Sequence, residues 1–353
     1  MTDTTLLPAI AAALERVDEA HYRGRDGRQV RQTTPASVIA RHLPLLDVHS
    51  GMRILEIGTG SGYTAALLAE LTGPNGSVVS VDVDPDLTQR ADELHHQAGF
   101  TTITTLAGDG YAGAPDHAPY DRLIAWTTPP HLPSAWTEQV GPDGVIVAPL
   151  ACAPIAYSTA MARTTVTAEH TPGSISLHRG QYVPMTTPHL ERARYATVSR
   201  RLDGDRFPSY LSAPWLADNE AQAEEVFGRV LNATFTEALD LGWPEVEHLK
   251  MWMIAQNPPG LTVAARDDET LIGLTTSSDL SFIALFPETR IVSDAETSEA
   301  LSTLRTLLRR WKQLGRPSIC DLTPEPCTVD GGWSLFLAST ELDELPLSQQ
   351  LSP

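Results

Sequence analysis

Short apolar runs alternate with amphipathic segments along the first half of the chain. The apolar runs predict buried strands, and the segments between them, with apolar residues every three or four positions, predict helices. The expected strands are RILEIG (53–58), SVVSVDV (77–83), TTITTLAGD (101–109), DRLIAW (121–126) and VIVAPL (145–150). The expected helices are 6–20, 37–46, 63–72, 85–99 and 131–140, with a loop at 21–37 that overlaps the start of the second helix. Strands that alternate with helices form a parallel sheet with right-handed crossovers, so we expect an α/β, doubly wound (Rossmann-like) domain.

The pattern changes after residue 150. An antiparallel edge for the same sheet is predicted by strand-like pieces at 156–169, 174–180 and 181–185. We then expect a helix over 219–242, strands over 261–268, 270–277 and 281–286, and a helix over 298–315. The chain is therefore predicted to have two domains, residues 1–190 and 191–353, of which the second is a smaller α/β or α+β domain that ends in a frayed tail at 341–353.

The charge and cysteine content exclude several classes of protein. A formal net charge of −19, with no stripe rich in Lys and Arg, repels nucleic acid. The sequence has no run of about eighteen apolar residues that could span a membrane, and its first residues lack the basic region of a signal peptide. Three cysteines are too few and too unevenly spaced for a disulfide framework or a zinc site, so we expect a cytoplasmic protein that binds no metal.

One local basic cluster precedes the first predicted strand. It consists of Arg23, Arg25, Arg28 and Arg31. Such a cluster is most often a solvated loop, but it is also suited to attract an acidic peptide.

Candidate chemistry concentrates at the ends of the first three strands. The first strand runs into EIGTGSG, in which Glu56 precedes glycines at 58, 60 and 62. Glycines permit a sharp turn and a close ligand, although a turn that only packs a helix on a strand has the same residues. The second strand ends in VDVDPD with Asp82, a carboxylate suited to ribose hydroxyls, and the third ends in AGDG with Asp109 and Gly110. No Gly-Lys-Ser or Gly-Lys-Thr follows, which excludes a P-loop.

These three motifs together resemble the S-adenosylmethionine site of class I methyltransferases. Unlike a dinucleotide, this cofactor has no pyrophosphate group to hold. The resemblance implies S-adenosylmethionine as the cofactor, S-adenosylhomocysteine as its product and no metal ion. It implies the following cofactor-binding residues: Glu56, Gly58, Thr59, Gly60, Gly62, Asp82, Val83, Gly108, Asp109 and Gly110.

A narrower resemblance covers residues 28–187. The order of its motifs, from RILEIGTGSG through AGDGYAGAPDHAPYDRLIAW to RGQYVPM at 179–185, is similar to that of protein-L-isoaspartate O-methyltransferases. The substrate loop of that family runs Gln-Thr-x-Ser-x-Pro, whereas this chain has RQTTPASVIA, which keeps Gln32 and Thr33 and displaces the serine. The resemblance implies that Thr33, Thr34 and Ser37 orient a substrate carboxylate, with capping of the next helix as the alternative role of Thr34 or Ser37.

The altered loop and the long second domain leave two substrate classes open. Extended relatives with the YVPM ending resemble methyltransferases that mature ribosomal peptides of the lanthipeptide, lasso and graspetide types, in which methylation of an aspartate leads to an aspartimide or an isoaspartate. The alternative is repair of isoaspartyl residues in damaged proteins. On the first reading the second domain helps to grip the peptide, and its tryptophans belong either to that grip or to the core: Trp215, Trp243, Trp252 and Trp311.

Two further functions have less support from the residues. TTPPHLP at 127–133 lies where amino-methyltransferases carry an Asn-Pro-Pro-aromatic type of motif, but Thr128 and His131 replace the amide and the ring. A catalytically silent cofactor-binding module would not need intact glycines beside two strand-end aspartates. His95 and His96 fall within a predicted helix, and we expect both to face solvent.

Overall fold

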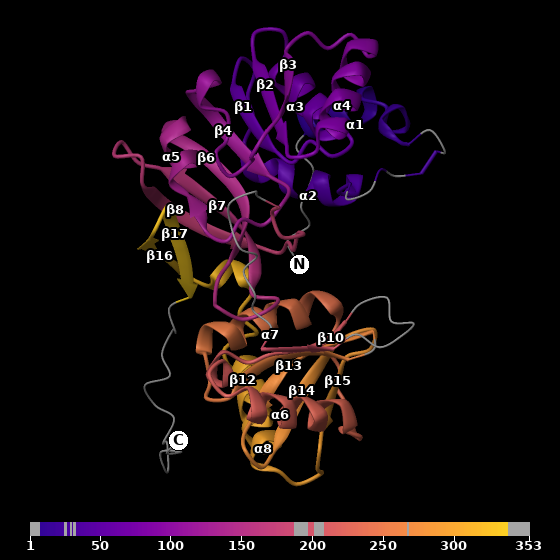
Figure 1. Cartoon of the computed structure of the whole chain (residues 1–353), viewed down its shortest axis with the longest axis vertical. Coiled ribbons are helices and arrows are strands. Elements are labelled where there is room, and N and C mark those ends of the chain that lie inside the picture. The colour runs from indigo at the N-terminus through magenta and orange to yellow at the C-terminus, as the bar shows by residue number, and fades with distance from the viewer. Residues whose placement is uncertain are drawn as a thin grey trace. The chain divides into compact units, whose positions relative to one another are not determined.

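Figure 1 shows the computed structural model, which describes residues 8–24, 27–28, 30, 33–186, 197–200, 208–266 and 268–337. The chain forms two compact units. The first comprises Met1–Ala151, Thr159–Arg192 and Pro326–Leu335, and the second comprises Cys152–Ser158, Ala193–Glu325 and Phe336–Pro353. The predicted boundary between residues 190 and 191, and the expected tail at 341–353, lie outside the described residues.

A seven-stranded sheet forms the centre of the first unit. Its strands are β1 (Arg53–Ile57), β2 (Ser77–Asp82), β3 (Ile103–Ala107), β4 (Tyr120–Ala125), β6 (Val140–Ala151), β7 (Thr159–Val166) and β8 (Pro172–His178). Their order is β3-β2-β1-β4-β6-β7-β8. The first five strands of that order are parallel, whereas β7 is antiparallel to both β6 and β8. This arrangement confirms the doubly wound α/β fold with an antiparallel edge.

Helices cover this sheet because their apolar faces need burial. The helices of the first unit are α1 (Pro8–Arg16), η1 (Glu19–Tyr22), α2 (Ala36–Leu46), α3 (Tyr63–Thr72), α4 (Pro85–Gln97), η2 (Pro115–His117) and α5 (Ser134–Gln139). Side chains from α1, α2 and α3 form one hydrophobic cluster with residues of β1, β2, β4, β6 and β7. Figure 1 shows α3 between α1 and these strands. The alternation of strands and helices therefore gives each helix a face of the sheet to cover.

The order of the strands creates a crevice beside the end of β1. This strand pairs with β2 on one side and with β4 on the other. The chain leaves β1 toward β2 and β3, and returns across β1 to form β4. In open α/β sheets, ligands bind at the carboxyl ends of the strands where this reversal occurs. Ile57 and Ala125, the last residues of β1 and β4, are paired and mark that place.

A small sheet joins a segment from the end of the described chain to the first unit. It consists of β5 (Leu132–Pro133), β16 (Pro324–Val329) and β17 (Gly332–Leu337), in the order β16-β17-β5. Gly332 opposes Pro133, and a Cβ atom at Gly332 would lie 2.0 Å from the carbonyl oxygen of Leu132. Only glycine permits this approach. The sequence analysis missed the pairing, because its partners lie about 200 residues apart.

The second unit is an antiparallel sheet with three longer helices, which fits the predicted α+β alternative. Its strands are β9 (Val198–Arg200), β10 (Ser209–Ser212), β11 (Phe235–Ala238), β12 (Leu261–Arg266), β13 (Glu269–Thr275), β14 (Leu280–Phe286) and β15 (Arg290–Ser293). Their order is β11-β15-β14-β13-β12-β10-β9. The helices are η3 (Pro214–Leu216), α6 (Glu220–Asn232), α7 (Trp243–Gln256), α8 (Glu299–Gln313) and η4 (Ile319–Asp321).

The sequence analysis was wrong about two segments of this unit. The predicted helix over 219–242 is instead α6 followed by β11, which pairs with β15 at the edge of the sheet. The β-branched and aromatic residues of β11 favour that edge over a longer helix. Helix α7 was not predicted, because apolar side chains are buried along most of its length and no polar stripe marks its outer face.

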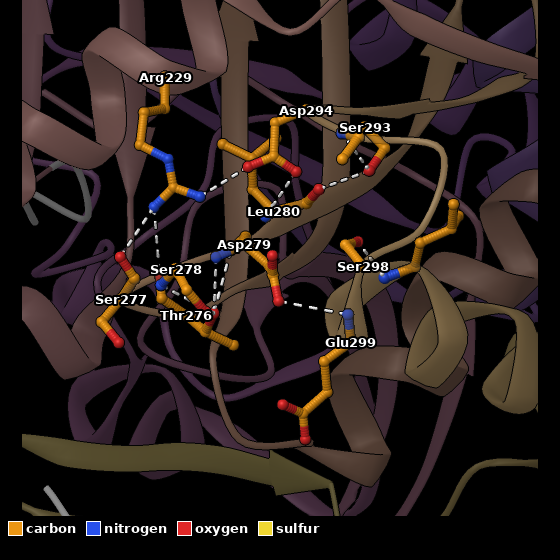
Figure 2. Close-up of polar contacts among 12 residues, drawn as sticks. Arg229, Thr276, Ser277, Ser278, Asp279, Leu280, Ser293, Asp294, Ser298 and Glu299 are labelled. Carbon is orange, nitrogen blue, oxygen red and sulfur yellow. Dashed lines mark hydrogen bonds and ion pairs between the residues drawn. The ribbon is translucent and has the colours of Figure 1, made fainter.

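A polar cluster fastens the turn between β13 and β14 to its neighbours (Figure 2). Arg229 on α6 donates to the carbonyl oxygen of Ser277 at 3.1 Å and to Asp294 Oδ2 at 2.7 Å. Asp294 Oδ1 accepts from the backbone N–H of Leu280 at 3.2 Å, so one carboxylate binds both a guanidinium and a strand end. Asp279 Oδ2 accepts from the N–H of Glu299, the first residue of α8, at 3.2 Å. The cluster thereby connects α6, the turn and α8.

We expect Arg229→Met to destabilise the second unit by about 1–3 kcal/mol, because it leaves a half-buried Asp294 without its cation and two carbonyl oxygens without a donor. Hydrogen exchange at the amides of β14 measures this loss for the unit alone. Arg309→Met is the matched control, since Arg309 is exposed and donates only to Thr306 among the contacts described. Equal exchange in the two variants would contradict the structural role of the cluster.

Among the described residues, no helix is long and apolar enough to cross a membrane. Within the same residues, no group of three or more His, Cys, Asp and Glu side chains gathers in a way that could hold a metal ion.

Candidate functional site

The glycine-rich turn between β1 and α3 requires glycine at two of its positions. Gly58 has a φ of +96°, and its N–H donates to the carbonyl oxygen of Val81 at 2.8 Å. Gly62 has a φ of +86°, and a Cβ atom there would lie 2.9 Å from Ala91 Cβ and 3.0 Å from His95 Nε2. The turn therefore joins β1 to β2 at one end and packs against α4 at the other.

The middle of the turn is fixed by the carboxylate that ends β2. The N–H of Gly60 donates to Asp82 Oδ2 at 3.0 Å, and the N–H of Asp84 donates to Asp82 Oδ1 at 3.1 Å. Gly60 itself has open space where a Cβ atom would be. Each carboxylate oxygen of Asp82 retains further lone pairs, so the group is held in place and is still able to accept hydrogen bonds from a ligand.

A pocket opens above this turn at the predicted crevice. The turn and α3 contribute Gly58, Thr59, Gly60, Ser61 and Thr64, together with Ile57. The neighbouring strand ends and loops contribute Val81, Asp82, Val83, Leu87, Gly110, Trp126 and Thr127. The remaining lining residues are Thr33 and Thr34, which precede α2, Ile39 in its first turn, and Val183, Pro184, Met185 and Thr186. Among the described residues that line the pocket, Asp82 is the only charged one.

The structure brings eight of the predicted site residues to this pocket. These are Thr33, Thr34, Gly58, Thr59, Gly60, Asp82, Val83 and Gly110. The other five do not line it: Ser37, Glu56, Gly62, Gly108 and Asp109. Of these, Gly108 donates its N–H to the carbonyl oxygen of Asp82 at 2.9 Å, and Asp109 Oδ1 accepts from the N–H of Tyr111 at 3.0 Å. Both therefore shape the loop that presents Gly110.

The side chain of Thr33 carries a hydrogen-bonding group that no described residue satisfies. Its Oγ1 atom is buried and has no hydrogen-bond partner within the described part of the chain. A buried hydroxyl without a partner is costly, so Thr33 Oγ1 requires a further hydrogen-bond partner. Ser37, in contrast, is exposed in the first turn of α2. Pro35 is the N-cap residue of that helix and makes no side-chain cap bond, which argues against the capping role considered for Thr34 and Ser37. Gln32 lies outside the described residues.

Glu56 lies beneath the pocket rather than in its wall. It is fully buried, and its two carboxyl oxygens accept from Ser80 Oγ at 2.6 Å and from Trp126 Nε1 at 3.0 Å. Ser80 Oγ is also 2.7 Å from Thr59 Oγ1. Burial raises the pKa of Glu56 to about 8, against the opposing effect of its two hydrogen bonds. The carboxyl group thus supports two lining residues, Thr59 and Trp126, from below.

A segment that the sequence analysis treated as a sheet edge instead closes the pocket. The N–H of Thr128 donates to the carbonyl oxygen of Val183 at 2.8 Å, and the N–H of Met185 donates to the carbonyl oxygen of Thr128 at 2.7 Å. Thr128 Oγ1 also donates to the carbonyl oxygen of Tyr182 at 3.0 Å. Thr128 is therefore engaged in holding residues 182–185, which removes it from the acceptor role it would have in an amino-methyltransferase. His131 Nε2 is hydrogen-bonded to Tyr111 Oη.

The expectation that His95 faces solvent is wrong, whereas His96 is exposed. His95 is only 2% exposed, and its Nε2 lies 2.8 Å from the carbonyl oxygen of Gly62. It fills the space that the missing side chain of Gly62 leaves between α3 and α4. His95 lies four residues after Ala91, and this spacing places both side chains on one face of the helix. That spacing would have indicated the burial of His95.

Comparison with known proteins decides the family. Residues 10–189 match the family model described as protein-L-isoaspartate(D-aspartate) O-methyltransferase. The chain belongs to this family.

The alignment with relatives in this family covers only part of each relative's length. A protein-L-isoaspartate O-methyltransferase of Methanococcoides burtonii is 42% identical over 113 residues, which are 32% of this chain and 56% of the relative. One of Methanoculleus marisnigri is 42% identical over 125 residues, which are 35% of this chain and 54% of the relative. The chain spans about half the length of the curated relatives it matches. A solved protein-L-isoaspartate O-methyltransferase aligns with 94% of this chain and 95% of its own, at 16% identity and a TM-score of 0.48.

The raised pKa of Glu56 predicts how the stability of the first unit depends on pH. Between its ordinary pKa of 4.5 and about 8, the folded chain holds a proton that the unfolded chain releases, so rising pH favours unfolding. We expect Glu56→Gln to remove this dependence, since glutamine is neutral at every pH. The free energy of unfolding of the variant should exceed that of the natural chain by a margin that grows between pH 5 and 9, to the order of a few kcal/mol.

Thermal unfolding across this pH range measures the effect. Glu138→Gln provides the control, because Glu138 is exposed on α5 in the same unit. If the Glu56→Gln curve ran parallel to that of the natural chain, Glu56 would be ionised in the folded state and the account of its support would fail.

Proposed function

We propose that the chain is an S-adenosylmethionine-dependent carboxyl O-methyltransferase that esterifies an aspartyl or isoaspartyl side chain. The composition of the pocket carries this proposal: one carboxylate, hydroxyl groups, backbone and apolar surface, with no Lys or Arg among the described lining residues. S-adenosylmethionine brings a cationic sulfonium, which a described lining with one carboxylate and no cation attracts, and a ribose that a strand-end carboxylate can bind. Asp82 suits both of these features.

Several lining residues fit the cofactor. Asp82 is placed to accept from the ribose hydroxyls, and Gly60 leaves open space for the ligand beside the turn. We assign the adenine to the side of Val83 and Gly110, with Gly108 and Asp109 shaping that loop. When bound, the sulfonium supplies an activated methyl group.

Other lining residues suit a carboxylate. Thr33 and Thr34 offer hydroxyl groups, and Thr33 Oγ1 has no partner within the described part of the chain. Met185 and Trp126 provide apolar surface that excludes water from the reacting atoms. A carboxylate is already ionised at neutral pH, so no general base is required. Catalysis then consists of aligning the acceptor oxygen with the methyl group and the sulfur.

Within this reaction we favour maturation of a constrained peptide over repair of damaged proteins. Most of the second unit lies beyond residues 10–189, which match the family model. Trp215 and Trp243 of this unit are exposed, whereas Trp252 and Trp311 are buried in its core. The first two are therefore available to grip a peptide. After esterification, the neighbouring backbone nitrogen attacks the ester and releases methanol, which gives an aspartimide that persists or hydrolyses to isoaspartate. Family membership and the match at Thr33 support repair as the second candidate.

The test is mass spectrometry of paired linear peptides, one isoaspartyl and one aspartyl, incubated with the whole chain and S-adenosylmethionine. Methyl ester on the isoaspartyl peptide alone would establish repair specificity and contradict maturation. If neither linear peptide reacts while the chain binds the cofactor, the proposal requires a constrained aspartyl peptide to react in the same assay. Failure with that peptide as well would leave a silent cofactor-binding module.

We expect Asp82→Asn to weaken S-adenosylhomocysteine binding at least about tenfold, because it removes the charge and leaves an amide facing the N–H of Gly60. Isothermal titration calorimetry of the whole chain measures the dissociation constant. Asp86→Asn is the matched control, since it removes the same charge from an exposed position of the following helix. Equal dissociation constants for the two variants would contradict the assignment of the ribose to Asp82.

A further inference from the structure

A buried hydrogen bond joins α2 to the segment that closes the pocket. His42 is 1% exposed, and its Nδ1 lies 2.7 Å from Tyr182 Oη. Its Nε2 lies 2.8 Å from the carbonyl oxygen of Arg179. A carbonyl oxygen can only accept, so Nε2 carries the proton and Nδ1 accepts from Tyr182. Burial lowers the pKa of His42 to about 4, which keeps this neutral form at physiological pH.

The two residues adjoin two different segments of the pocket lining. His42 lies on α2, whose preceding loop presents Thr33 and Thr34 and whose Ile39 also lines the pocket. Tyr182 directly precedes the lining segment 183–186. Their hydrogen bond therefore sets the spacing between the hydroxyl-bearing loop and that segment.

The other contacts of Tyr182 connect it to the remainder of the site. Its ring centroid lies 5.8 Å from that of Trp126, which lines the pocket and donates to Glu56. Its carbonyl oxygen accepts from Thr128. Among the contacts described, Tyr182 thus has three supports, and the bond to His42 is the one that reaches α2, the helix that follows Thr33 and Thr34.

We propose that His42 and Tyr182 are positioning residues, which hold segment 183–186 at the distance from Thr33 and Thr34 that the acceptor carboxylate needs. This inference rests on the proposed function. A purely structural hydrogen bond would contribute to stability alone, whereas a positioning bond also changes how the acceptor reacts. Misplacement of reacting groups by about 1 Å can cost about a hundredfold in rate.

The experiment compares Tyr182→Phe with Tyr120→Phe. Each variant removes one hydroxyl and keeps its ring, and Tyr120 Oη also makes a buried bond in the same unit, to the carbonyl oxygen of Ala114 at 2.8 Å, without lining the pocket. We expect Tyr182→Phe to lower kcat/KM about 10- to 100-fold for whichever of the isoaspartyl, linear aspartyl or constrained aspartyl peptides the natural chain methylates, with the S-adenosylhomocysteine dissociation constant changed less than about threefold. Tyr120→Phe should leave kcat/KM within about twofold.

A second pair of variants tests the partner. His42→Gln retains a donor and an acceptor and should preserve more activity than His42→Ala. Adding Tyr182→Phe to His42→Ala should cost little more than His42→Ala alone, because both changes remove the same bond. Equal kinetics for Tyr182→Phe and Tyr120→Phe, or full additivity in the double variant, would overturn the proposal.

Hydrogen exchange provides a measurement that does not depend on activity. The N–H of Met185, bonded to Thr128, should exchange faster in Tyr182→Phe but not in Tyr120→Phe. If the natural chain methylates no peptide, the proposed function fails, and this comparison still decides whether the pair holds the segment. Unchanged exchange at Met185 in Tyr182→Phe would overturn the inference by itself.

Discussion

The site depends most on the hydrogen bonds of the buried Glu56 carboxyl group. This group accepts hydrogen bonds from Ser80 of β2 and from Trp126, which directly follows β4. Through Ser80 it reaches Thr59 in the glycine-rich turn, and through Trp126 it reaches Tyr182 and then His42. Burial of a carboxyl group is costly unless it is neutral and hydrogen-bonded, and both conditions are met here. The lining elements from three strands and α2 therefore share one support.

The site requires little reactivity from its side chains. In the proposed reaction the acceptor arrives ionised and the donor arrives activated, so the protein supplies position and a dry environment. Small residues at the turn, one fixed carboxylate at Asp82 and hydroxyls at Thr33 and Thr34 are sufficient for that purpose. This explains why the described lining residues include no histidine or cysteine.

Local sequence patterns predicted the parts of the fold and site that depend on neighbours along the chain. The apolar runs gave β1 to β4 within a few residues, and the glycine spacing located the turn at Gly58–Gly62. Asp82 could be predicted as well, because its position at the end of a strand can be read from the neighbouring residues of the sequence. The hydrogen bond between His42 and Tyr182 could not be predicted in this way, because its partners lie 140 positions apart.

Two misses in the second unit have a different cause. Helix α7 is apolar on most sides, so the period that reveals an amphipathic helix is absent, and β11 is a short edge strand that closely follows α6. Strand β17 was missed because its partner, β5, contains two residues and lies far away in the sequence. These elements form through tertiary contacts rather than through local preference.

The central claim is that the pocket transfers a methyl group to a carboxylate oxygen. The most direct measurement uses S-adenosylmethionine with a tritiated methyl group, the whole chain and its acceptor peptide, followed by mild alkaline treatment. A carboxyl methyl ester is hydrolysed under these conditions, so the account predicts that the transferred tritium is released as volatile methanol. Tritium that stays on the peptide after the treatment would show methylation at nitrogen or another stable atom and would contradict the account.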